Sequence, residues 1–203
     1  MDRKPVSVKS YANIAIVKYW GKADAERMIP STSSISLTLE NMYTETKLSF
    51  LPKDATSDVM YIGDELQGEK ETTKASKVLD IFRTNPNQHV KIETWNNMPT
   101  AAGLSSSSSG LSALVKAANE LFQVGKTQSE LAQIAKFASG SSSRSFFGPL
   151  AAWDKDSGEV YPVETDLKLA MIMLVLTDQK KPVSSRDGMK LCTETSTSFP
   201  EWI

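Results

Sequence analysis

The sequence has few of the features that mark a specialised class of protein. Its 203 residues include one cysteine, so no disulfide can form within the chain, and a reducing compartment suits it. One histidine and one cysteine provide no cluster with metal-ligand spacing. The 23 basic and 24 acidic residues leave a net charge of −1, so no overall field attracts nucleic acid.

Long apolar segments are also missing. The N-terminus lacks the apolar stretch of a signal peptide. The longest apolar run, Leu169–Leu176, has eight residues, whereas a membrane span needs about 20. We therefore predict a cytoplasmic protein with no membrane partner. The run itself is predicted to be a buried strand, with Met171 and Met173 in the core.

The remaining composition, 40% hydrophobic and 23% charged residues, is typical of a folded globular chain with one good core. Apolar alternation predicts strands that start at Val6 and that cover 35–39, 44–50, 59–62 and 90–94, and a hairpin of 150–154 with 159–163. Helical spacing predicts helices over 75–82, 111–121 and 131–138, the last after a capping box at 127–130, and one that starts at Ser184 or Ser185. Because strands and helices do not alternate strictly, the fold class is α+β.

The most informative segment is Pro99–Gly110, in which five serines follow Gly103-Leu104 and a helical pattern begins directly afterwards. Unpaired N–H groups and the helix dipole make such a start a cradle for anions. A flexible serine linker is the alternative, which the adjoining periodicity disfavours. The segment is not a Walker A motif, and Gly125-Lys126-Thr127 does not complete one, because Glu120 stands where that motif needs glycine.

The pattern Pro-x-x-x-Gly-Leu-x-Ser-Ser resembles the nucleotide loop of the GHMP small-molecule kinases. Residues 12–22 and 138–145 resemble one branch of that superfamily, the mevalonate diphosphate decarboxylases, and 33–38 and 183–189 fit as well. The likeness runs from about Val6 to the end of the chain and is greatest to Gram-positive bacterial forms. It implies a GHMP-type nucleotide- and substrate-binding domain over 1–182, a mixed sheet with helices on one face. Residues 183–203 would begin a second α+β domain that is mostly absent.

The resemblance implies a reaction in which ATP and magnesium drive decarboxylation of mevalonate 5-diphosphate to isopentenyl diphosphate, with ADP, phosphate and carbon dioxide as further products. Such a site must hold a diphosphate, a carboxylate and the ATP phosphates, which requires several cations and many N–H or hydroxyl donors. A homodimer is a weaker implication of the same likeness.

The resemblance also implies roles for individual residues. The substrate diphosphate would be bound by Tyr19, Trp20, Gly21, Lys22, Ser139, Gly140, Ser141 and Ser142. Arg144 would hold the carboxylate, Asn13 would help to orient it, and Lys18 would stabilise the transferring phosphoryl group. ATP would be cradled by Pro99, Ala102, Gly103, Leu104, Ser105, Ser106, Ser107 and Ser108, with Ser107 near magnesium. A catalytic Ser185, with Ser184 and Arg186, would approach the phosphates from the other side.

Each of these residues also has a plainer interpretation. Lys18 and Lys22 could be solvated surface residues, and Arg144 could cap the preceding helix or pair with Asp154. Residues 139–143 could be an ordinary loop after a helix. His89 is more readily a surface residue than a base, and Cys192 a core residue rather than a nucleophile.

One expected segment has no match. The catalytic aspartate of the resembling family lies in an Asp-Ala-Gly-Pro-type motif, and the printed sequence contains none. We therefore expect no turnover from these 203 residues alone. A small-molecule kinase that does not decarboxylate, or a nucleotide-binding fragment, remain the alternatives.

Overall fold

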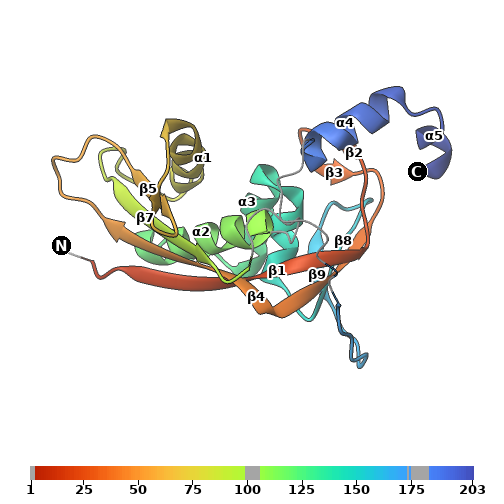
Figure 1. Cartoon of the computed structure of the whole chain (residues 1–203), viewed down its shortest axis with the longest axis horizontal. Coiled ribbons are helices and arrows are strands. Elements are labelled where there is room, and N and C mark those ends of the chain that lie inside the picture. Colours follow the sequence, from red (N-terminus) through yellow and green to blue (C-terminus); the bar gives the residue numbers. More distant parts are fainter. Residues whose placement is uncertain (1–2, 99–105, 173, 175–182) are drawn as a thin grey trace.

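A computed structural model describes residues 3–98, 106–172, 174 and 183–203 (Figure 1). One long strand, β4 (Ser34–Phe50), organises the sheet, because β1 (Val6–Val17) pairs with it antiparallel along almost its whole length. On its other side, β4 pairs with β8 (Leu150–Trp153) near its start and with β7 (Val90–Asn96) near its end. The sheet is completed by β5 (Val59–Ile62), parallel to β7, by β6 (Glu65–Leu66) and by β9 (Val160–Val163).

Helices α1 (Glu69–Leu79), α2 (Ser106–Phe122) and α3 (Gln128–Ala138) lie over one face of this curved sheet (Figure 1). Their apolar sides meet Leu48, Val90 and Ile92 of the sheet in the main core. The predicted α+β class, with a mixed sheet and helices on one face, is confirmed. The described part of the chain contains no helix that is long and apolar enough to cross a membrane.

Smaller elements lie at the end of the sheet opposite the N-terminus (Figure 1). They are the hairpin of β2 (Lys22–Asp24) and β3 (Ile29–Pro30), the 3-10 helix η1 (Gly140–Phe146), α4 (Ser185–Thr195) and α5 (Phe199–Trp202). The structure confirms three local predictions: the capping box at Thr127 and Glu130, the β8–β9 hairpin, and the helix capped by Ser184.

Irregular pairing in β1 decides which side chains face η1. The register between β1 and β4 shifts between Tyr11 and Ala12. Such a bulge changes the alternation of a strand, so residues three apart can face the same layer. Ser10 and Asn13 use this freedom, since both form hydrogen bonds with η1 residues or with α2 on the helical side.

Three sequence predictions need correction. Residues 35–39 and 44–50 belong to one strand, because the polar break at Glu40-Asn41 falls where β1 and β4 change register rather than at a turn. The segment 139–145 is largely the buried helix η1 rather than a loop. Residues 169–172 and 174 form no strand, and Ile172 and Leu174 are each 85% exposed, because no described strand pairs with them. Met173 and 175–176 lie outside the described residues.

Candidate functional site

Arg144 is a buried cation held by neutral partners. Its side chain is 2% exposed, and its Nε and Nη1 donate to the hydroxyl oxygens of Ser36 and Ser34, at 3.1 and 3.0 Å. No described residue accepts a hydrogen bond from Nη2, and no described carboxylate pairs with the guanidinium. Burial lowers the pKa of Arg144 to about 10, partly offset by Tyr19, so the group stays charged at neutral pH. Neither a helix cap nor a pair with Asp154 accounts for it.

Burying an unpaired charge is costly unless an anion compensates it. The planar fork of arginine matches the geometry of a carboxylate. Arg144 is therefore suited to an anionic ligand rather than to the stability of the fold. Its partners Ser34 and Ser36 lie in the segment 33–38 that fits the family pattern, although the resemblance assigns them no role.

Asn13 holds both ends of η1. Its Nδ2 donates to the carbonyl oxygen of Ser141 at 3.0 Å and to Ser145 Oγ at 2.7 Å. Its Oδ1 is buried, as is Ser142 Oγ, and neither atom has a hydrogen-bond partner among the described residues. Buried polar atoms normally have partners, so these two atoms, on η1 and on the residue that holds it, mark a place where a ligand with hydroxyl or phosphate groups could bind.

Tight aromatic packing brings the 19–22 segment to η1. The Tyr19 ring meets Trp153 of β8 edge to face, with centroids 4.7 Å apart, and lies 5.7 Å from the Arg144 guanidinium carbon. A Cβ on Gly140 would stand 2.6 Å from the Trp153 ring, so only glycine fits there. Trp153 was not among the predicted site residues, since an aromatic residue in a short strand reads as core.

Gly21 and Lys22 lead from this contact into β2. Gly21 has a φ of 85°, a left-handed conformation that glycine adopts without strain, and Phe199 of α5 packs against it. Lys22 Nζ lies 3.1 Å from Met28 Sδ. Residues from the second half of α4 close a small cavity of about 150 Å³ over this pair: Met189, Lys190, Thr193 and Glu194. Trp20 is half-buried, and its backbone N–H donates to Thr32.

The other predicted site residues lie around this centre. Ser139 and Ser141 are half-buried, with their hydroxyl oxygens 3.3 Å apart, whereas Gly140 and Ser142 are buried. Lys18 is exposed just after β1. Ser184 caps α4 and Ser185 begins it, and both are exposed at that helix's N-terminal end. Arg186 follows in the helix.

The predicted phosphate cradle is described only from its helical side. Pro99, Ala102, Gly103, Leu104 and Ser105 lie outside the described residues. Ser106 begins α2, which carries no acidic residue in its first turn, so the positive end of its dipole is not neutralised there. Ser107 is exposed and Ser108 is buried. The described residues contain no group of three or more histidine, cysteine or acidic side chains that could hold a metal ion.

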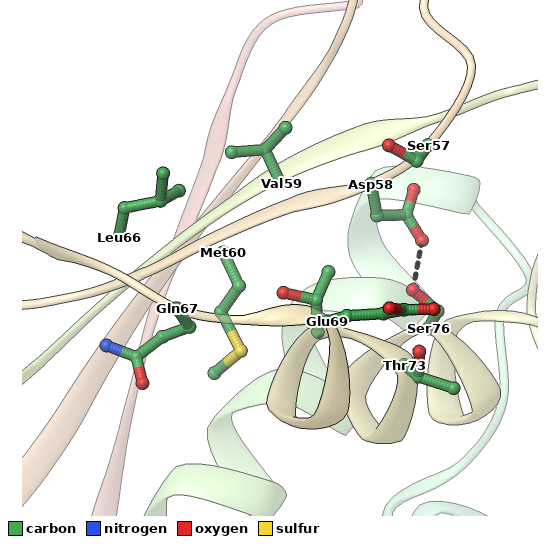
Figure 2. A pocket seen from close by; sticks show the side chains of 10 residues that line it. Ser57, Asp58, Val59, Met60, Leu66, Gln67, Glu69, Thr73 and Ser76 are labelled. Carbon is green, nitrogen blue, oxygen red and sulfur yellow. Dashed lines mark hydrogen bonds between the residues drawn. The ribbon is translucent and has the colours of Figure 1, made fainter.

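A second hollow, of about 410 Å³, lies between β5 and α1 (Figure 2). Its buried carboxylate, Asp58, accepts from Ser76, Arg83 and the N–H of Val90, at 2.6, 2.7 and 2.9 Å. Burial would raise the pKa of Asp58, but these hydrogen bonds outweigh it and lower the pKa. His89 is half-buried beside it, with Nδ1 3.6 Å from the carboxylate, rather than at the open surface. Asp58 is fully used in joining elements, which gives it a structural role.

The comparisons agree with the local resemblance. Residues 10–161 match the family model described as the diphosphomevalonate decarboxylase-like N-terminal domain. The solved mevalonate pyrophosphate decarboxylase from Streptococcus pyogenes is 67% identical, covers all of this chain and 64% of its own, and superposes with a TM-score of 0.93. Diphosphomevalonate decarboxylase from Saccharomyces cerevisiae is 34% identical over 97% of this chain and 56% of its own length.

A further similar structure contains both MVAPP and AMPPCP. MDDEF in complex with MVAPP, AMPPCP and magnesium is 36% identical, with 98% of this chain and 64% of that chain covered and a TM-score of 0.80. The present chain thus spans a little over half to two-thirds of the length of these relatives.

Proposed function

Since the chain belongs to the family of diphosphomevalonate decarboxylases, we propose that it binds mevalonate 5-diphosphate and ATP for the family's ATP-dependent decarboxylation to isopentenyl diphosphate. The observation that carries this proposal is Arg144, a guanidinium that is 2% exposed and has hydroxyl groups but no described carboxylate as partners. The substrate's carboxylate would provide the missing anion.

The residues around Arg144 suit the rest of this substrate. Tyr19 and Gly140 bring the 19–22 segment against η1, so Lys22 and the η1 hydroxyl and N–H groups could receive the diphosphate. Asn13 Oδ1, a buried acceptor, suits the tertiary hydroxyl, which is a donor. The combination of a cation for a carboxylate with further donors for a diphosphate favours this acid over a simple alcohol.

ATP would bind at the N-terminus of α2. The first turn carries no acidic residue, and the exposed Ser107 is the hydroxyl that we assign to the magnesium-bound phosphates. Magnesium, when bound, would neutralise charge on the phosphate chain. We keep Lys18 and Ser185 as candidates for contacts to the transferring group, with Ser184 and Arg186 beside it.

Decarboxylation needs a substrate carboxylate that is held in position and stays ionised. The tertiary hydroxyl oxygen bonds to the terminal phosphorus of ATP while the bond to ADP breaks, and the hydroxyl proton passes to a carboxylate of the kind that the family's unmatched aspartate motif would supply. The substrate's own C–O bond, now to a phosphorylated oxygen, then breaks and releases phosphate. The C–C bond to the carboxylate supplies the electron pair of the alkene, and carbon dioxide leaves. Arg144 would orient the C–C bond to the carboxylate. Because its described partners are hydroxyl groups, the positive charge of Arg144 remains available to the substrate.

The test is titration calorimetry of the purified chain with mevalonate 5-diphosphate, followed by assays for ADP and carbon dioxide with Mg-ATP added. We expect binding that Arg144→Gln weakens at least tenfold, with Lys74→Met, a change at an exposed α1 residue, as the control. We expect neither product, because the aspartate motif has no match. Carbon dioxide would refute that second expectation, ADP alone would favour a kinase, and no binding by folded protein would overturn the proposal.

A further inference from the structure

A seam of polar side chains lies between α2 and β1, apart from the residues assigned to ligands. Ser10 of β1 and Ser112 of α2 are fully buried, and their hydroxyl oxygens are 2.7 Å apart. One turn further along α2, Lys116 places Nζ 3.2 Å from Ser10 Oγ and 3.3 Å from the carbonyl oxygen of Ser145. The side chains of the seam therefore join a strand, a helix and the backbone of η1.

The hydrogen bonds of this seam form a continuous chain. Ser112 Oγ lies 2.9 and 3.0 Å from the carbonyl oxygens of Ser108 and Ser109, which can only accept. Either hydroxyl can donate in the contact between Ser10 and Ser112, and Ser10 Oγ also lies 3.4 Å from the carbonyl oxygen of Ser145. Ser10 Oγ accepts from Lys116, whose ammonium group has donors only. These contacts run without a break from Lys116 to the first turn of α2.

The two ends of the seam lie in the two halves of the proposed site. Ser108 and Ser109 belong to the first turn of α2, which would face the ATP phosphates. Ser145 follows Arg144 directly, and its hydroxyl accepts from Asn13, which also holds Ser141. A shift of η1 relative to α2 would break the Lys116 contacts, so the seam fixes the position of one relative to the other.

Lys116 is not explained by stability. Its neighbours from β1 and η1 are the hydroxyl of Ser10, the carbonyl of Ser145 and the Phe146 ring, whose centroid is 4.8 Å from Nζ. No described carboxylate pairs with it, and burial lowers the pKa of Lys116 to about 8. A methionine would fill similar space without a desolvated charge, and such replacements are often neutral or stabilising.

We propose that Lys116 is a positioning residue which, through Ser10 and Ser112, holds η1 and the first turn of α2 in one register and so couples the substrate and nucleotide halves of the site. The coupling to ligands rests on the function proposed above. The register itself is a property of the free chain, so it can be tested without any ligand.

The first measurement is amide hydrogen exchange of the free chain. Lys116→Met and Ser112→Ala are each expected to speed exchange about tenfold in both 106–112 and 140–146. The control, Asn119→Ala, removes bonds from the far end of α2 to Lys126 and should leave 140–146 unchanged. Unchanged exchange in 140–146 in both seam variants, or uniform acceleration through the whole chain, would overturn the proposal.

The second measurement is calorimetric binding of mevalonate 5-diphosphate with and without magnesium and a non-hydrolysable ATP analogue. We expect each ligand to strengthen binding of the other in the wild-type chain, and Lys116→Met to reduce that factor at least fivefold while its unfolding midpoint at pH 7 is no lower. Lys116→Arg, which keeps the donors, should retain most of the coupling. Equal coupling in Lys116→Met and wild type would refute the inference. If the wild-type chain binds no mevalonate 5-diphosphate, both the function proposed above and the coupling are refuted. The fixed position of η1 relative to α2 is tested separately, by the hydrogen exchange of the free chain.

Discussion

Replacing Lys116 with methionine should change the stability of the chain in opposite directions at neutral and at alkaline pH. The folded pKa is about 8, against an ordinary value of 10.5, because burial disfavours the charged form. Below pH 8 both the folded and the unfolded chain hold the proton, so the folded state bears the full cost of the buried charge. Between pH 8 and 10.5 the folded chain loses the proton first, so wild-type stability rises relative to the variant.

The size of the effect follows from the shift. A difference of one pKa unit corresponds to about 1.4 kcal/mol, so the buried charge costs up to about 3 kcal/mol at pH 7. The variant also loses the hydrogen bonds to Ser10 and Ser145, each worth about 1 kcal/mol. We therefore expect Lys116→Met to be more stable by about 1 kcal/mol at pH 7 and less stable by about 2 kcal/mol above pH 10.5.

The assay is urea denaturation of both proteins at pH 7, 9 and 10.5, with the difference in unfolding free energy plotted against pH. The same lysine-to-methionine change at Lys74, which is exposed on α1, serves as the matched control. A constant difference for Lys116→Met across this range would show that the ammonium group is well solvated and that our account of its burial is wrong.

Three further changes test the site and its scaffold. Arg144→Ala should weaken mevalonate 5-diphosphate binding by about 2–5 kcal/mol, measured by calorimetry, and a change within error would place the carboxylate elsewhere. Gly140→Ala should lower the unfolding free energy by about 1–3 kcal/mol and alter Trp153 fluorescence, because the added Cβ would lie 2.6 Å from that ring. The control is Gly110→Ala, which should not destabilise the chain, because a Cβ at Gly110 would have no neighbouring atom within 4 Å. Thr127→Ala should cost about 1 kcal/mol in chemical denaturation through loss of the α3 cap, and an unchanged midpoint would contradict the capping box.

Local sequence signals were sufficient for many elements of the fold. The Thr127–Glu130 capping box and the Ser184 cap were predicted and are present, because both depend on contacts within one helical turn. The single strand β4 was not predicted as one element, since the polar residues at its centre look like a turn. Only pairing with β1, with its shift of register, makes that break compatible with a continuous strand.

The apolar run from Leu169 shows the limit of hydrophobic patterning. Eight apolar residues in a row predict burial, but a strand also needs a neighbouring edge to accept its hydrogen bonds. No described strand pairs with residues 169–172 or 174, and Ile172 and Leu174 are exposed. The apolar pattern therefore predicts that the segment prefers an apolar environment, but it does not identify the element that would provide that environment.

The motifs name candidate site residues, but they do not give the tertiary contacts that hold those residues in place. Arg144 was predicted by resemblance, but its bonds to Ser34 and Ser36 join residues more than 100 positions apart in the sequence. Asn13 was expected to orient the substrate, whereas its visible bonds hold η1. No periodicity reveals such pairings, because a serine on the polar side of a strand has the same signature whether it faces water or a buried guanidinium.

The two serine-rich segments make the same point about composition. Serine competes with the backbone for hydrogen bonds, so a serine-rich composition alone would favour loops. In the structure, one segment contributes Ser108 and Ser109 to the buried side of α2, where the buried Ser112 follows them, and the other largely forms η1. Lys116, four residues after Ser112, extends this polar stripe along a helix otherwise packed on the core. The short side chain of serine lets two backbone segments approach closely, and its hydroxyl group can still form hydrogen bonds with them. Serine is therefore suited to holding helices and strands together around a site that must also bind anions.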